Sequence, residues 1–188
     1  MNRGAMLVGE LDKVIKESKY IACIAEGGAE SAIINLLLDY GKLKFTREQL
    51  LEQEPIRERN GDKFAKRYLG KGFTEKILIL RILDSRRENF IVKKAYQNKI
   101  KLINVITAPE IEMLIILNEK KYDKFKKTGK KPSDYCIEDM KMNDVKTREF
   151  IYSYFKDIDT LINVIKEYKR IANVQKGELT LYDLLQEG

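Results

Sequence analysis

The chain has 188 residues, of which 44% are hydrophobic and 35% charged, and no segment contains the roughly 18 apolar residues needed to span a bilayer. This length accommodates one domain with a hydrophobic core and a helical appendage, and we expect a cytoplasmic protein without a membrane partner. The absence of histidine excludes Ser-His and Cys-His nucleophile pairs and imidazole zinc sites, while a net charge of +7 favours a nucleic-acid partner.

The first third of the chain predicts a strand between two helices. Apolar residues at helical spacing predict an amphipathic helix over residues 7–18. Residues 20–25 are an unbroken apolar run, which predicts a strand buried on both faces. After two glycines, apolar residues on one helical face predict a helix over residues 29–40, and Gly41 is placed to cap its end.

The middle of the chain gives weaker patterns and then a second strand. In residues 42–75 the stretch "LKFT" fits a short strand, and residues 62–69 fit a basic helix. Residues 77–83 are apolar except for Arg81, which predicts a second buried strand. A serine and a glutamate at capping-box spacing then predict a helix over residues 85–98.

A third strand is predicted over residues 102–106, followed by the apolar helix "IEMLIIL" with Pro109 in its first turn. Strands that alternate with helices indicate an α/β fold, with a largely parallel sheet of about four strands flanked by helices. From about residue 119 the pattern is helical and rich in lysine. We therefore predict an α/β core with its N-terminal helix over residues 1–118 and a basic helical subdomain, packed on the core, over residues 119–188.

Two of the predicted strands end on a carboxylate, Glu26 and Asp84. The carboxyl ends of parallel strands lie along one edge of a sheet, where open α/β folds place their ligands. Two carboxylates there could share a Mg²⁺ ion, and Gly27 and Gly28 would let the backbone approach a phosphate. The alternative is that both acids are ordinary strand-end residues and that the glycines make a tight turn.

Further charged residues adjoin these strand ends. Glu112 precedes a run that is apolar on nearly every side, so its carboxylate is expected to be partly buried and to need a partner or a metal. Its alternative role is to complement the helix dipole. Arg81, Arg86 and Arg87 surround Asp84 and could either clamp a phosphate or neutralise the acids.

A lysine-rich stretch follows the third predicted strand and helix. Its lysines are interleaved with aromatic residues, a composition that suits contact with a nucleic-acid backbone. The candidate phosphate-binding lysines are Lys120, Lys121, Lys124, Lys126 and Lys127. A solvated basic face is the alternative.

The order of these motifs resembles the topoisomerase/primase (Toprim) fold, and within it the RloB-like group associated with bacterial abortive-infection defence against phage. The resemblance covers roughly residues 20–117: a strand ending in Glu-Gly, a second ending in Asp, and a third leading into "TAPEIEMLIIL". It implies that Glu26, Asp84 and Glu112 are the catalytic and metal-binding acids. Arg86 stands where the family has the second aspartate of its Asp-x-Asp motif.

Two functions are consistent with the sequence. The resemblance implies a nuclease that depends on Mg²⁺ or Mn²⁺, acts in phage defence and has an ATPase or another defence protein as a partner. The substitution at Arg86 favours the alternative, a catalytically inactive Toprim-like module that binds nucleic acid or protein.

Overall fold

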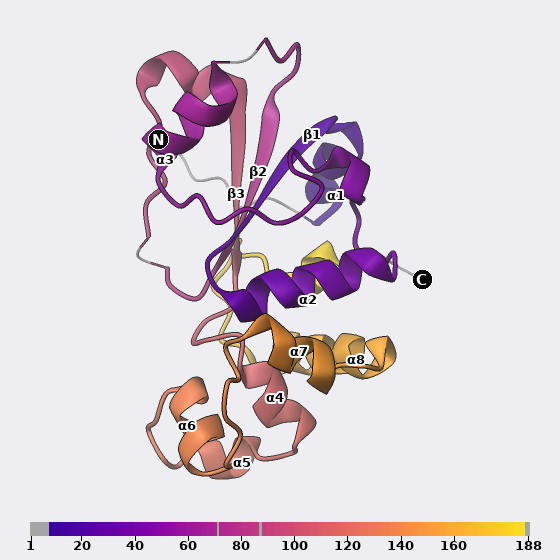
Figure 1. Ribbon diagram of the computed structural model, residues 1–188, viewed down its shortest axis with the longest axis vertical. Helices are drawn as coiled ribbons and strands as arrows, with labels where there is room; N and C mark the ends of the chain where they lie inside the picture. Colours follow the sequence, from indigo (N-terminus) through magenta and orange to yellow (C-terminus); the bar gives the residue numbers. More distant parts are fainter. Residues whose placement is uncertain (1–7, 71, 87, 187–188) are drawn as a thin grey trace.

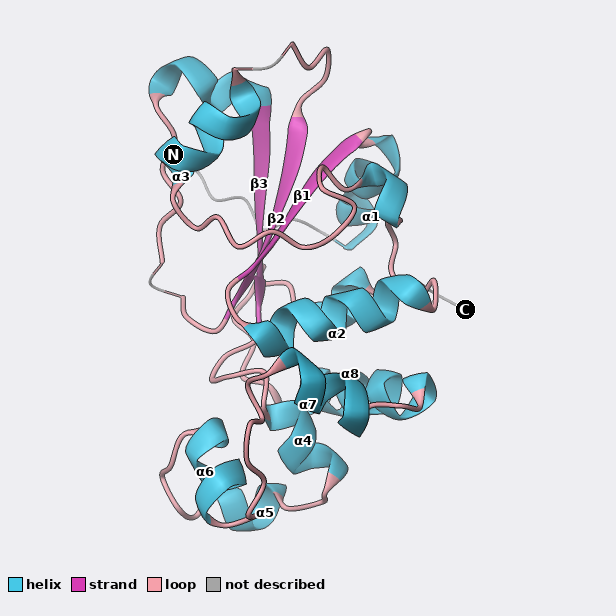
Figure 2. Cartoon of the chain, in the orientation of Figure 1, coloured by secondary structure: helices cyan, strands magenta, loops and turns pink. Residues whose placement is uncertain are grey.

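The core of the protein is a small parallel β-sheet flanked by helices (Figures 1 and 2). The computed structural model describes residues 8–70, 72–86 and 88–186. Within them the sheet has three strands in the order β1-β2-β3, all parallel. Their bounds are β1 (Tyr20–Ala25), β2 (Ile77–Leu83) and β3 (Ile100–Ile106).

The first two strands coincide with their predicted ranges, and the third begins two residues earlier than predicted. Of the fourth strand expected in "LKFT", the structure has only a single antiparallel bridge between Leu43 and Leu185. All seven residues of β2 are buried, as expected for a central strand covered on both faces.

Helices and short helical turns surround this sheet. The α-helices are α1 (Val8–Glu17), α2 (Gly28–Asp39), α3 (Gly61–Phe64), α4 (Met113–Asn118), α5 (Tyr122–Phe125), α6 (Pro132–Glu138), α7 (Arg148–Tyr154) and α8 (Ile158–Ile171). The remaining helical turns are η1 (Arg47–Gln49), η2 (Ala65–Leu69), η3 (Lys94–Lys99) and η4 (Leu181–Leu184). The N-terminal residue of the helix predicted over 7–18 lies outside the described residues.

Each face of the sheet is covered by a different set of helices. One face contributes to a large apolar cluster with α1, α2, α4 and the C-terminal helices, and the other packs against α3 and η2 in a smaller cluster. Figure 1 shows α3 on one side of the strands and α1 on the other. Side chains on alternate residues of a strand therefore enter different cores.

The helix α2 ends as its sequence predicts. Gly41 has a φ of +61°, the left-handed conformation that glycine adopts without strain. Its N–H donates to the carbonyl of Leu38, and the N–H of Lys42 donates to that of Leu37. These two bonds satisfy carbonyl groups that a helix otherwise leaves unpaired at its C-terminus.

Two predicted helix starts are wrong. Residues 88–93 are irregular, and only η3 occupies part of the helix predicted over residues 85–98. Pro109 lies before α4 rather than in its first turn, because α4 begins at Met113. The glutamate of the first predicted cap, Glu88, pairs with Arg81 and Arg59.

The C-terminal helices pack directly on the sheet's own helices: α7 lies against α2 and α8 against α4. The large apolar cluster includes residues from both sides of residue 118, such as Leu114 and Ile165, so one core extends through both parts of the chain. In the described part of the chain, no helix is long and apolar enough to cross a membrane.

Candidate functional site

The carboxyl ends of the three strands bring four acidic residues to one edge of the sheet. Glu26 follows β1, Asp84 follows β2, and Glu112 precedes the first residue of α4, after β3. Glu30, in the first turn of α2, is a fourth acid that the motif analysis did not identify. In the strand register Ala25 pairs with Ile82, and Ile82 with Val105, so the strands end at nearly the same level.

Glu26 and Asp84 nevertheless belong to opposite faces of the sheet. Side chains two residues apart in a strand lie on the same face of the sheet. Glu26 therefore follows the face of Ile24, which packs in the smaller apolar cluster, and Asp84 follows the face of Ile82, which packs in the larger one. The charge of Asp84 contributes to the raised pKa values of both Glu30 and Glu26. The two strand-end carboxylates do not form a simple facing pair.

Glu26 lies in a charged network with two arginines and a second glutamate. Its Oε2 is 3.4 Å from Nη1 of Arg59, and its Oε1 is 4.0 Å from Nη2 of Arg81. Its side chain is only 10% exposed. Burial, followed by the hydrogen bond and the charge of Glu88, raises the pKa of Glu26 to about 8, although the Arg59 charge opposes this shift.

Arg81 is a buried cation in the middle of the central strand. It is 1% exposed, its guanidinium lies 5.3 Å from the ring centroid of Phe90, and its Nη2 donates to Oε2 of Glu88 at 3.1 Å. Burial lowers the pKa of Arg81, and the charges of Glu88 and Glu26 oppose this effect. The predicted phosphate contact is therefore not accessible to Arg81 in this conformation, and its role here is to balance the buried carboxylates.

The glycines after β1 leave room for neighbouring groups of the protein itself. A Cβ atom on Gly27 would lie 2.3 Å from Oε2 of Glu30, and one on Gly28 would lie 2.8 Å from the carbonyl oxygen of Lys146. The start of α2 is thus covered by the Glu30 carboxylate and by the chain that leads into α7. The predicted approach of a phosphate to these glycines would require both groups to move.

Glu30 and Glu112 are buried acids with raised pKa values. Burial is the largest cause in both, and it raises the pKa of Glu112 to about 7. Glu112 is 4% exposed and also feels the charge of Glu30, while the charge of Lys146 partly stabilises both carboxylates. The expectation that Glu112 is a buried acid is confirmed.

Glu110 anchors the same edge to the C-terminal helices. Its Oε2 accepts a hydrogen bond from the backbone N–H of Ser133 at 2.9 Å, and its Oε1 lies 3.3 Å from Nζ of Lys146. Burial alone would raise the pKa of Glu110, but these bonds more than offset it, so the pKa is lowered. Glu110 therefore links this edge to segments more than 20 residues away in the sequence.

Buried polar atoms without a hydrogen-bond partner among the described residues gather at this edge. They are Glu26 Oε1, Ser31 Oγ, Arg81 Nε, Arg81 Nη1 and Arg148 Nε. An unpaired buried polar group costs about 1–3 kcal/mol, so a group of them in one place indicates a position that a polar ligand or water would stabilise. No three acids or cysteines of the described chain, however, are close enough together to form a ready metal site.

Arg86 is held away from the acids by the C-terminal segment. Its Nε and Nη2 donate to the two carboxylate oxygens of Glu178 at 2.6 and 2.9 Å, and Nη2 also donates to the carbonyl of Asn173 at 3.1 Å. Phosphate binding by Arg86 would have to replace these bonds. Arg87, the other predicted phosphate ligand, lies outside the described residues.

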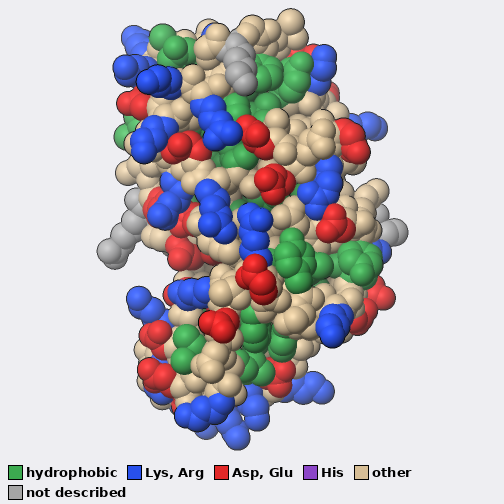
Figure 3. Space-filling model, viewed as in Figure 1, with side chains coloured by type: hydrophobic (Ala, Val, Ile, Leu, Met, Phe, Trp, Pro, Cys, Tyr) green, Lys and Arg blue, Asp and Glu red, His purple; other side chains and the backbone are tan. Residues whose placement is uncertain are grey.

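The lysine-rich stretch forms one end of the molecule. Figure 3 shows basic side chains gathered at the end where α5 lies in Figure 1. Lys126 pairs with Asp123 at 2.7 Å, a contact that ties up one of the five predicted phosphate ligands. The other four have no ion pair within the described chain: Lys120, Lys121, Lys124 and Lys127.

Comparison of the chain with protein-family models, curated proteins and solved structures gives no match.

Proposed function

We propose that the protein is a Toprim-like nuclease that depends on Mg²⁺ or Mn²⁺ and uses the acids at the carboxyl edge of its sheet. The observation that carries this proposal is the concentration at one edge of buried acids and of buried polar atoms without a hydrogen-bond partner, among them Oε1 of Glu26. Groups of this kind persist in folded proteins when a ligand or a catalytic role compensates for them. A role in phage defence and an ATPase partner are part of the proposal and rest on the resemblance alone.

The chemistry of the donors suits a hard cation. Glu26, Asp84 and Glu112 offer carboxylate oxygens, and Mg²⁺ typically takes one or two carboxylates and keeps several waters. A bound Mg²⁺ would supply a Lewis acid for phosphate oxygens and for water. Arg59 would then be released from Glu26 to stabilise a phosphate, because its side chain is 56% exposed.

The lysines around α5 would bind the nucleic-acid backbone. Four of them have no partner for their charge among the described residues, and each phosphate contact releases counterions and makes binding weaker at higher salt. Neutralising Lys124 and Lys127 together should therefore weaken binding at low salt and reduce its salt dependence. Neutralising the paired Lys126 should have a smaller effect.

The test is a cleavage assay on single-stranded and double-stranded DNA and RNA with Mg²⁺ or Mn²⁺. We expect cleavage by the wild type and its loss in Glu26→Gln and Asp84→Asn. Glu54→Gln is a matched control, since Glu54 is exposed and has no ion pair in the described part of the chain. Full activity in both site variants, or activity in chelator, would contradict the proposal.

One observation favours a second function, a catalytically inactive module that binds nucleic acid. Glu26 already has arginine partners, and the described residues contain no ready cluster of three metal-ligating side chains. This function predicts nucleic-acid binding without cleavage, unaffected by Glu26→Gln and weakened by neutralising Lys124 and Lys127. Binding of nucleic acid without cleavage in either Mg²⁺ or Mn²⁺ would favour the inactive binding module over the nuclease.

A further inference from the structure

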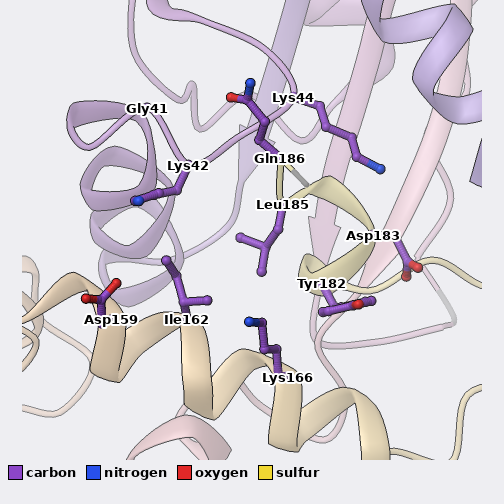
Figure 4. A pocket seen from close by; sticks show the side chains of 10 residues that line it. All are labelled: Gly41, Lys42, Lys44, Asp159, Ile162, Lys166, Tyr182, Asp183, Leu185 and Gln186. Carbon is purple, nitrogen blue, oxygen red and sulfur yellow. The ribbon is translucent and has the colours of Figure 1, made fainter. Parts of the chain in front are cut away.

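A sizeable cavity lies away from the acidic edge. It has a volume of about 810 Å³ and lies between the segment after α2, the outer face of α8 and the C-terminal segment that follows η4 (Figure 4). Pockets of roughly 300–1,000 Å³ are typical of small-molecule sites. Nothing in the proposed nuclease function uses this cavity.

Two of its charged residues are already committed to partners. Lys44 forms an ion pair with Asp12 at 2.6 Å, and Asp183 accepts hydrogen bonds from the backbone N–H and hydroxyl of Thr180 and pairs with Lys169 at 2.8 Å. These contacts fix the walls of the cavity. Lys42, Lys166 and Asp159 remain to face a ligand.

Lys42 and Lys166 line the cavity from different elements, and neither forms an ion pair within the part of the chain that the structure describes. Figure 4 shows them on opposite walls with the apolar side chains of Ile162 and Leu185 between them. Asp159 lines the same cavity one helical turn before Ile162. Two free cations face one free carboxylate, so the cavity favours an anion.

The rest of the lining suits an aromatic ring and hydroxyl groups. Tyr182 is 42% exposed, so part of its aromatic side chain is accessible to a ligand, and it lies across the cavity from Asp159 in Figure 4. The Gln186 amide can both donate to and accept from the edge of a base. The Asp159 carboxylate can accept from sugar hydroxyls.

We propose that this cavity binds a nucleoside monophosphate, with the phosphate between Lys42 and Lys166 and the base against Tyr182. The combination of two cations, an open aromatic ring, an amide and a carboxylate matches the phosphate, base and ribose of such a ligand. The cavity volume of about 810 Å³ is large enough for one nucleotide. The proposal is independent of the acidic edge and of the lysines near α5.

The test is isothermal titration calorimetry of the full chain with AMP, GMP, CMP and UMP, and with inorganic phosphate and ribose 5-phosphate as partial ligands. We expect saturable binding of at least one nucleotide in the micromolar to low millimolar range, and weaker binding of both partial ligands. Lys166→Ala and Lys42→Ala should each weaken nucleotide binding at least about tenfold, the value of a charge-assisted hydrogen bond. Tyr182→Ala should weaken nucleotide binding about fivefold or more while leaving phosphate binding unchanged.

Lys156→Ala is the matched control, because Lys156 is exposed between α7 and α8 and forms no ion pair with any described residue. Thermal unfolding of each variant shows whether it is folded. Absence of binding by all four nucleotides overturns the proposal. It is also overturned if inorganic phosphate binds as tightly as the nucleotides, or if both lysine variants bind as well as Lys156→Ala.

Discussion

Replacement of Glu26 by glutamine tests the buried acidic network through its pH dependence. In the folded chain the pKa of Glu26 is raised to about 8 from its ordinary value of 4.5, with burial as the largest cause. A carboxyl group with a raised pKa contributes stability that is full below its unfolded pKa and is lost as pH rises through the folded pKa. The contribution of Glu26 to the stability of the wild type should therefore fall with rising pH.

The magnitude follows from the two pKa values. Between about pH 5 and about pH 7 the unfolded chain releases most of the Glu26 proton while the folded chain keeps it, which lowers the free energy of unfolding by about 2.5 kcal/mol. Glutamine keeps the shape of the protonated acid and does not titrate. Between about pH 5 and about pH 7, Glu26→Gln should therefore gain about 2.5 kcal/mol of unfolding free energy relative to the wild type.

Urea unfolding of both proteins at several pH values measures this difference. The comparison removes the effects of the acids that do not interact with Glu26, because both proteins share them. If the two stability curves remain parallel from acidic to mildly alkaline pH, the Glu26 carboxyl group is not held in its neutral form by burial and Glu88. The description of the network would then be wrong.

Three further predictions use the same assay. Glu112→Gln should stabilise the protein more at alkaline pH than at acidic pH, by up to about 3 kcal/mol, because burial raises the pKa of Glu112 to about 7; no change with pH would contradict this. Gly28→Ala should lower the free energy of unfolding by about 1–3 kcal/mol, since its Cβ would lie 2.8 Å from a backbone carbonyl, whereas Gly9→Ala, with nothing within 4 Å, should not destabilise. Glu178→Gln should cost about 0.5–1 kcal/mol near neutral pH and less in acid, because the pKa of Glu178 is lowered chiefly by its hydrogen bond with Arg86; an equal cost at every pH would contradict the ion pair.

The strands were predictable because their signal is local. Residues 20–25 are all apolar and residues 77–83 are apolar except for Arg81, and in the structure both strands are buried on both faces apart from the first residue of β1. The prediction of a helix over residues 85–98 was wrong. It rested on the spacing of a serine and Glu88, but in the structure the Glu88 carboxylate pairs with Arg81 and Arg59. Tertiary ion pairs override a sequence spacing that is compatible with a cap.

The position of the site could be predicted from the sequence, but the arrangement of its side chains could not. A parallel sheet places residues after its strands along one edge, so Glu26 and Asp84 could be located there from the sequence. Which face each side chain occupies depends on the register between β1 and β2, and a sequence does not reveal that register. Glu30 was available as a signal, one helical turn after Glu26, but its burial depends on Gly27 and on the chain before α7.

The most direct test of the proposed function is a titration of the full chain with Mn²⁺, in which calorimetry or electron paramagnetic resonance detects the bound ion. We predict saturable binding that is lost in Glu26→Gln and in Asp84→Asn and is retained in Glu54→Gln. Thermal unfolding of each variant establishes that it is folded. No saturable binding by the wild type, or equal binding by the wild type and both site variants, would contradict the claim that these strand-end acids hold a metal.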